Sequence, residues 1–158
     1  MDPTAARDAE SAAATSRRRS PRAHPAPDTV LTVVMRDGDG RVVGRGRLHD
    51  LSAEGAGVLM PIRIAERIRA LQQVEIALPL APDGPAITLA GTTRYVRWAL
   101  PPGADGFGSK VLHLGIEFDA GTASLKAAAD ALDAWIAPRL AAGDAPGPLR
   151  PAQETAAR

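Results

Sequence analysis

Short apolar segments separated by glycine- and proline-rich turns fill the middle of this 158-residue chain. Within them Val, Ile, Leu and Thr alternate with polar or small residues, which is the period of a β-strand with one buried face. The sequences Asp37-Gly38-Asp39-Gly40 and Pro82-Asp83-Gly84-Pro85 each separate two such segments and are strong turn formers. The pattern therefore predicts two β-hairpins in an all-β body.

Six strands are expected from this alternation. They run over Thr29 to Arg36, Arg41 to His49, Gly55 to Met60, Val74 to Leu78, Ile87 to Trp98 and Val111 to Phe118. The stretch Ile62 to Leu71 carries Ile64, Ile68 and Leu71 at helical spacing but is short. We therefore expect one or two turns of helix or a loop there.

A single helix is expected at the end of the body, over Thr122 to Leu140. Its apolar stripe has five members at helical spacing: Leu125, Ala129, Leu132, Ile136 and Leu140. Thr122 is a suitable N-cap, and Gly143 lies just beyond the other end. Six short antiparallel strands and one terminal helix predict a barrel with the helix against an open side or end, because closure removes unprotected strand edges.

The two ends of the chain differ in composition from its body. Residues 1–16 and 143–158 contain almost no large apolar side chain. Such segments cannot offset the entropy cost of ordering, so we expect a disordered leader and a disordered tail. The domain is expected to span 17–142, with an arginine-bearing arm at 17–28 and the folded barrel and helix at 29–142.

Composition excludes several classes of function. Nineteen basic and 18 acidic side chains give a net charge of +1, so any anion-binding site must be local. The chain has no cysteine, which excludes disulfides, thiolate nucleophiles and cysteine-ligated zinc. No apolar run approaches the roughly 20 residues that span a bilayer, and the N-terminus does not resemble a signal peptide. We expect a cytoplasmic protein without membrane insertion.

Motifs for catalysis or metal binding are missing from the sequence. His24, His49 and His113 do not have the spacing of metal ligands, and no Gly-x-Ser-x-Gly or His-Glu-x-x-His is present. The Gly-x-Gly pairs do not open a helix after a strand, as phosphate-binding loops do. We therefore expect no enzyme activity, no catalytic residue, no metal site and no cofactor.

Four arginines, Arg17, Arg18, Arg19 and Arg22, lie just before the first expected strand. A guanidinium makes two parallel hydrogen bonds to a phosphate, or to the O6 and N7 edge of guanine. Two arginines four residues apart can therefore hold both kinds of group. Taken alone, the segment is more often a solvated basic tail.

A second polar feature is the turn Asp50-Leu51-Ser52-Ala53-Glu54-Gly55. Asp50 and Ser52 alternate, so on extended backbone both side chains point to the same face. Asp50 can accept the N1 and N2 protons of guanine, and Ser52 offers a donor and an acceptor. Gly55 permits the close approach of a ligand. Taken alone, an Asx-type turn closed by local hydrogen bonds is the better interpretation.

Considered as a pair, Arg18-x-x-x-Arg22 and Asp50-x-Ser52-x-x-Gly55 resemble the two signature motifs of PilZ domains, which are bacterial receptors for cyclic di-GMP. The order and spacing of the motifs, the hairpin expected between them, and Leu114-Gly115-Ile116-Glu117-Phe118 all fit. The resemblance covers roughly Arg17 to Leu140. It implies a six-stranded antiparallel β-barrel with a C-terminal α-helix, the architecture also predicted from periodicity and turns.

The resemblance also implies roles for individual residues. Arg18 and Arg22 would grip phosphates and guanine edges, while Asp50 and Ser52 would read a guanine on the outer surface of the barrel. Arg17 occupies a position that looks like the family's selector for an intercalated ligand dimer, which implies two nucleotides per chain.

Further positions follow from the same resemblance. Gly55 would keep the turn open. In some members an aromatic residue on a late strand stacks on a base; Tyr95 is the nearest match here and Trp98 the second, with a core aromatic as an equal alternative. Ser20 departs from the family's pattern, because an aromatic is common at that position.

Three functions remain open at this point. The first is a cyclic di-GMP receptor that orders its arginine arm on binding and regulates a partner protein in motility, exopolysaccharide or biofilm formation, without a DNA partner. The second is a PilZ-like adaptor that acts through protein contacts alone, as in type IV pilus assembly. The third is a nucleic-acid binder that uses the arginine arm, although base-stacking aromatics beside the basic run are missing.

Overall fold

The computed structural model describes residues 20–100, 110–143 and 150–151. Its elements in chain order are β1 (Thr32–Arg36), β2 (Val42–Leu51), β3 (Gly55–Pro61), the 3-10 helix η1 (Ile62–Arg67), β4 (Gln73–Pro79), β5 (Ala86–Leu100), β6 (Val111–Phe118), α2 (Ala123–Ala142) and β7 (Arg150–Pro151). All six expected strands and the expected terminal helix are present. No helix in this described part of the chain is long and apolar enough to cross a membrane.

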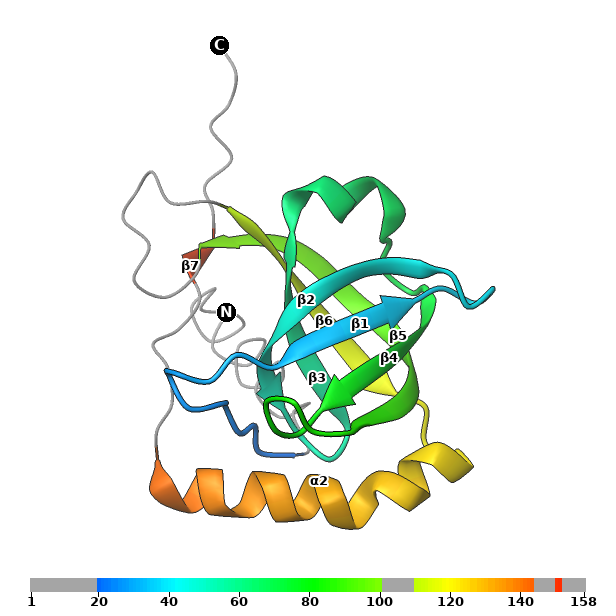
Figure 1. The fold of residues 1–158 in the computed structure, drawn as a ribbon. Helices are drawn as coiled ribbons and strands as arrows, with labels where there is room; N and C mark the ends of the chain where they lie inside the picture. Colours follow the sequence, from blue (N-terminus) through cyan, green and yellow to red (C-terminus); the bar gives the residue numbers. More distant parts are fainter. Residues whose placement is uncertain (1–19, 101–109, 144–149, 152–158) are drawn as a thin grey trace, which may run out of the picture.

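The first six strands close into a barrel. Going around it, the order is β1, β2, β3, β6, β5 and β4, and β4 pairs again with β1. All six pairings are antiparallel. In Figure 1, α2 lies across one end of the barrel and η1 stands at the other. The predicted fold class, a six-stranded antiparallel barrel with a C-terminal helix, is therefore confirmed.

The turn chemistry read from the sequence is present in the first hairpin. The Asp37 carboxylate accepts hydrogen bonds from the backbone N–H groups of Asp39 and Arg41, at 3.0 and 2.9 Å. Gly40 adopts a φ of +77°, a region that glycine occupies without a steric penalty. Local hydrogen bonds thus reverse the chain between β1 and β2.

The interior of the barrel is built mainly from aliphatic side chains. Alternate residues of the strands, including Val33, Met35, Ile76 and Leu114, are fully buried. In η1 and the segment after it, Ile64 and Ile68 are buried as their helical spacing suggested, whereas Leu71 is 70% exposed with a φ of +62°. The short helix and the segment after it therefore bury two of the three residues that lie at helical spacing.

The helix α2 begins and ends where its caps predict. The Thr122 Oγ1 accepts a hydrogen bond from the backbone N–H of Leu125 at 3.3 Å, and Gly143 takes the left-handed conformation at a φ of +71°. The Thr122 side chain therefore pairs one of the free backbone N–H groups at the start of the helix, and Gly143 lets the chain turn away at its end.

The buried face of α2 differs from the predicted stripe. The residues that it buries are Ala128, Leu132, Trp135 and Ile136. Leu132 and Ile136 were expected, but Ala129 and Leu140 are exposed, so their assignment to the core was wrong. Trp135 has the largest apolar surface on the helix, so its burial is the most favourable. With Trp135 facing the barrel, Ala129 and Leu140 face solvent.

Residues Arg150–Pro151 form the two-residue strand β7, which pairs with Ala99 and Leu100 near the end of β5. They lie within 143–158, the segment expected to be a disordered tail. The expected leader 1–16 and most of that tail lie outside the described residues, so the domain boundaries remain predictions.

Replacing Leu132 by alanine tests the packing of α2 against the barrel. Leu132 is 1% exposed, and Leu→Ala changes at buried sites cost about 2–5 kcal/mol of unfolding free energy. Leu140→Ala, on the same helix but 38% exposed, is the control and should change stability by less than about 1 kcal/mol. Denaturant unfolding measures both; equal losses would show that the helix does not dock through Leu132.

Candidate functional site

Two irregularities in the barrel place polar side chains on its outer face. Strand β2 shifts register between Leu48 and Asp50 where it pairs with β3, and β5 shifts between Thr93 and Tyr95 where it pairs with β6. A β-bulge of this kind adds one residue to a strand and re-aims the side chains that follow. Without the shift in β2, strict alternation from the buried Leu48 would turn Asp50 into the core.

The two bulges stand at the same level of the barrel. Asp50 pairs with Gly57, Gly57 with Gly115, and Gly115 with Tyr95. A Cβ atom at Gly57 would stand only 2.5 Å from the Asp50 Oδ2, and one at Gly115 would overlap the Tyr95 ring. Two glycines in the middle of this row therefore let the carboxylate and the ring lie over bare backbone.

Asp50 is held by the N-terminal segment. It is 5% exposed, and its Oδ1 accepts a hydrogen bond from Nη1 of Arg22 in a salt bridge. One residue on, Ala23 and Leu51 exchange two backbone hydrogen bonds of 2.9 Å each. This bridge holds Arg22 next to the carboxylate, so Arg22 of the first motif and Asp50 of the second lie in contact.

Ser52 follows the end of β2 and closes the turn to β3. Its Oγ accepts hydrogen bonds from the backbone N–H groups of Glu54 and Gly55, at 3.3 and 3.2 Å. The Ser52 backbone N–H also donates to the Gly55 carbonyl at 2.8 Å. The turn interpretation is therefore right for Ser52. It is wrong for Asp50, which pairs with Arg22 instead.

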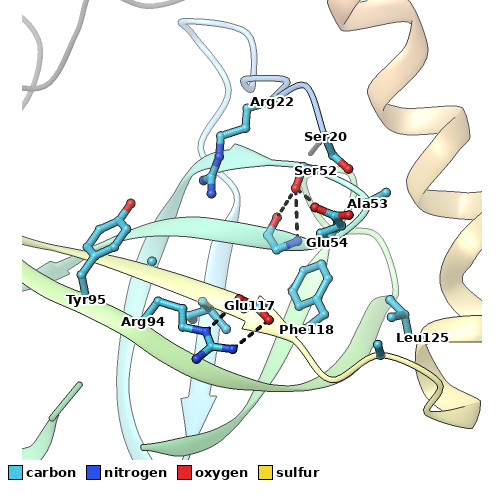
Figure 2. A pocket seen from close by; sticks show the side chains of 14 residues that line it. Ser20, Arg22, Ser52, Ala53, Glu54, Arg94, Tyr95, Glu117, Phe118 and Leu125 are labelled. Carbon is cyan, nitrogen blue, oxygen red and sulfur yellow. Dashed lines mark hydrogen bonds and ion pairs between the residues drawn. The ribbon is translucent and has the colours of Figure 1, made fainter. Parts of the chain in front are cut away.

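A hollow of about 690 Å³ opens beside this turn. Its lining includes Arg22, Ser52, Gly55, Arg94, Tyr95 and Glu117. Figure 2 shows Arg22 reaching into the region from one side, with Arg94 and Glu117 on the other side and Tyr95 at the margin. Four predicted site residues thus share one cavity, while Asp50 is joined to it through Arg22.

The remaining predicted residues are placed differently. Arg17 and Arg18 lie outside the described residues. Trp98 pairs with Leu112, a core residue at the inner side of β6, and it does not line the hollow. Of the two aromatic residues considered for base stacking, only Tyr95 borders the cavity.

Arg94 and Glu117 form an ion pair that the sequence did not reveal. Nε and Nη2 of Arg94 each donate to one oxygen of the Glu117 carboxylate at 2.8 Å. The hydrogen bonds from Arg94 lower the pKa of Glu117, and the same carboxylate raises the pKa of Arg94. The pair depends on the register between β5 and β6, which spacing along the chain does not disclose.

A row of aromatic rings also crosses the outer face. His24 contacts His49, His49 contacts His113, and His113 contacts Tyr95, each edge to face with ring centroids 5.2 to 5.4 Å apart. The guanidinium of Arg97 lies 3.9 Å from the centre of the Tyr95 ring, an attractive cation–π geometry. The row therefore links the segment after Arg22 to β2, β6 and β5.

Two histidines of this row, His49 and His113, favour the neutral form. Burial, and after it the neighbouring His49, lower the pKa of His113 to about 4. Burial also lowers the pKa of His49, although Asp50 acts in the opposite direction. Within the described part of the chain, no group of three or more acidic or histidine side chains is placed to hold a metal ion.

Comparison with known families identifies the domain. The model of the PilZ domain matches residues 16–132 of the chain. This chain belongs to the PilZ family. The matched range spans both motifs and confirms the resemblance read from the sequence.

Solved structures agree with this assignment at the level of the fold. The PilZ domain of YcgR from Escherichia coli with c-di-GMP aligns with a TM-score of 0.60 at 16% identity, covering 80% of this chain and 94% of that one. The Bacillus subtilis inhibitor of motility MotI (DgrA) aligns with a TM-score of 0.55 at 16% identity, covering 81% and 53%. The MrkH–c-di-GMP complex of K. pneumonia aligns with a TM-score of 0.53 at 14% identity, covering 75% and 52%. No curated protein matches the chain.

Stability should depend on pH through His113. Its pKa is about 4 in the folded protein and about 6.5 in an unfolded chain, so the unfolded state binds more protons between these values. We expect the free energy of unfolding to fall as the pH falls from about 6.5 to about 4. Denaturant unfolding at several pH values measures this slope.

The variant His113→Asn tests whether His113 causes this dependence of unfolding free energy on pH. Because asparagine does not titrate in this range, stability of the variant should change less with pH than that of the wild type. An identical slope in both proteins would exclude His113 as its source.

Proposed function

We propose that this PilZ domain is a cytoplasmic receptor for cyclic di-GMP. One observation carries the proposal: Arg22 of the first motif contacts Asp50 of the second at the edge of a hollow that Ser52 and Gly55 line. The likeness in fold to YcgR and MrkH, which were solved with c-di-GMP, supports the same ligand. On this proposal the chain binds a signal and catalyses no reaction.

The ligand would exchange with the Arg22–Asp50 pair. A guanine presents N1–H and N2–H donors to the Asp50 carboxylate, which leaves the Arg22 guanidinium for a phosphate or for a guanine edge. Ser52 and Gly55 would approach the same base from the turn. A buried carboxylate is costly without a partner. Exchange of Arg22 for the guanine therefore costs less free energy than separation of the Arg22–Asp50 pair without a replacement.

Arg17 and Arg18 would complete the site from the arm. Their guanidinium groups would bind the phosphates, and Arg17 would favour an intercalated dimer of the ligand, giving two nucleotides per chain. Each charge-assisted hydrogen bond contributes about 1.5–3 kcal/mol, and together they must offset the cost of ordering the arm. We expect a dissociation constant that is micromolar or lower.

The output would be a rearrangement of the arm. Its residues 20–28 already lie on the barrel through the Arg22–Asp50 pair and the backbone bridge from Ala23 to Leu51. A ligand that replaces the pair would change how the arm is held and so present a new surface, which a partner protein in motility, exopolysaccharide or biofilm regulation would recognise. MotI is named as an inhibitor of motility and MrkH as a c-di-GMP-dependent transcription factor, and this chain covers about half of each. The absence of a DNA partner therefore remains a prediction.

Titration calorimetry with cyclic di-GMP tests the receptor function. Wild-type protein should bind, and Arg22→Ala should lose detectable binding because it removes a contact to the ligand and the partner of Asp50. Arg45→Ala, an exposed arginine on β2 away from the hollow, should bind as the wild type does.

GTP and single-stranded DNA are the control ligands. Preference for DNA would favour the nucleic-acid binder, and no binding of any nucleotide by the wild type would favour an adaptor that acts through protein contacts. Full affinity in Arg22→Ala would remove this residue from the site.

Affinity should also fall as salt is added. Contacts between arginines and phosphates are screened by ions, so the logarithm of the binding constant should decrease as ionic strength rises. The same titration at three or four sodium chloride concentrations measures the effect. A constant that does not change with salt would contradict phosphate binding by the arm.

A further inference from the structure

The ion pair between Arg94 and Glu117 lies at the hollow but belongs to neither motif. Both side chains line the cavity, and they are 50% and 54% exposed. An exposed ion pair contributes little to stability, about 0–1 kcal/mol. Packing and stability therefore do not explain why two charged side chains are held in this geometry at the proposed ligand site.

The bulge in β5 and the carboxylate of Glu117 together aim the guanidinium. Arg94 is the extra residue of the bulge, between Thr93 and Tyr95, so it and Tyr95 come to the same side of the strand. Glu117 accepts from Nε and Nη2 on one edge of the guanidinium. The Nη1 end has no protein hydrogen-bond partner among the described residues, so donors remain for a ligand.

The chemistry of the pair suits a base better than a phosphate. Its net charge is zero, and the Glu117 carboxylate would repel an anionic group that approached the guanidinium. A guanine edge is neutral and presents two acceptors, O6 and N7, which match two N–H donors of an arginine. Adenine presents a donor in place of O6, and this donor would face the arginine N–H groups.

We propose that Arg94, positioned by Glu117, binds the O6 and N7 edge of a guanine of the bound dinucleotide and so selects guanine over adenine. The inference rests on the proposed function, and it adds a base-reading arginine from the barrel to the arginines of the arm. Tyr95, next in the chain, borders the same space with its ring. A base seated there would contact the ring and the guanidinium from one strand.

A charge-neutral double variant tests this role. Arg94→Met with Glu117→Gln removes the pair and leaves the net charge unchanged, so a change in affinity reports lost hydrogen bonds rather than lost charge. Affinity for cyclic di-GMP, measured by calorimetry, should fall at least about tenfold, the discrimination that a bidentate base contact provides. Cyclic di-AMP, measured by competition, should bind the variant as weakly as it binds the wild type. The slope of affinity against salt should stay the same.

The matched control is Arg63→Met with Glu66→Gln, an exposed arginine and glutamate on η1 at the opposite end of the barrel. This control should bind both dinucleotides as the wild type does, and thermal unfolding should show that both double variants are folded.

Unchanged affinity for cyclic di-GMP in the Arg94 variant, or an equal loss for both dinucleotides, would overturn the assignment. Failure of the receptor function itself is distinguishable, because the wild type would then not bind.

Discussion

The contact between Arg22 and Asp50 connects the N-terminal segment to the barrel. A carboxylate that is 5% exposed must be paired, because an isolated buried charge costs several kcal/mol. Arg22 supplies the charge, the backbone bridge from Ala23 to Leu51 fixes its position, and a His24 Nδ1 contact of 2.9 Å to the His49 carbonyl extends the attachment. A ligand that hydrogen-bonds to the Asp50 carboxylate in place of Arg22 must also change how the N-terminal segment is held. Ligand binding and rearrangement of this segment would therefore occur together.

The site owes its position to irregular pairing in a regular barrel. Asp50 and Tyr95 face outward because β2 and β5 each carry an extra residue at the level where Gly57 pairs with Gly115. The two strands between them supply backbone without side chains there, which leaves room for the carboxylate and the ring. Bulges of this kind interrupt pairing, and they are frequent beside functional sites.

Features set by neighbouring residues in the chain were predictable from the sequence. The strands, both hairpin turns and the caps at Thr122 and Gly143 follow from alternation, turn residues and capping preference, all of which act within a few residues. Contacts set by register were not predictable. The Arg94–Glu117 pair joins β5 to β6, and it appears only once the strands are aligned. The prediction of the buried face of α2 was wrong for a related reason. Which residues of the helix are buried depends on its packing against the barrel, which buries Trp135 and leaves Leu140 exposed.

On the proposed function, the two arginine–carboxylate pairs at the hollow have different roles in ligand recognition. The Arg22–Asp50 pair has a buried carboxylate, so opening it requires a ligand whose own hydrogen bonds replace those lost. The Arg94–Glu117 pair is half exposed, and a base can add to its open end without breaking it. At the Arg22–Asp50 pair, a ligand binds only if it replaces every hydrogen bond that Asp50 loses. Because Arg22 belongs to the arm, this exchange couples ligand binding to the position of the arm. The second adds base selectivity at little cost, because its guanidinium is already oriented before the ligand arrives.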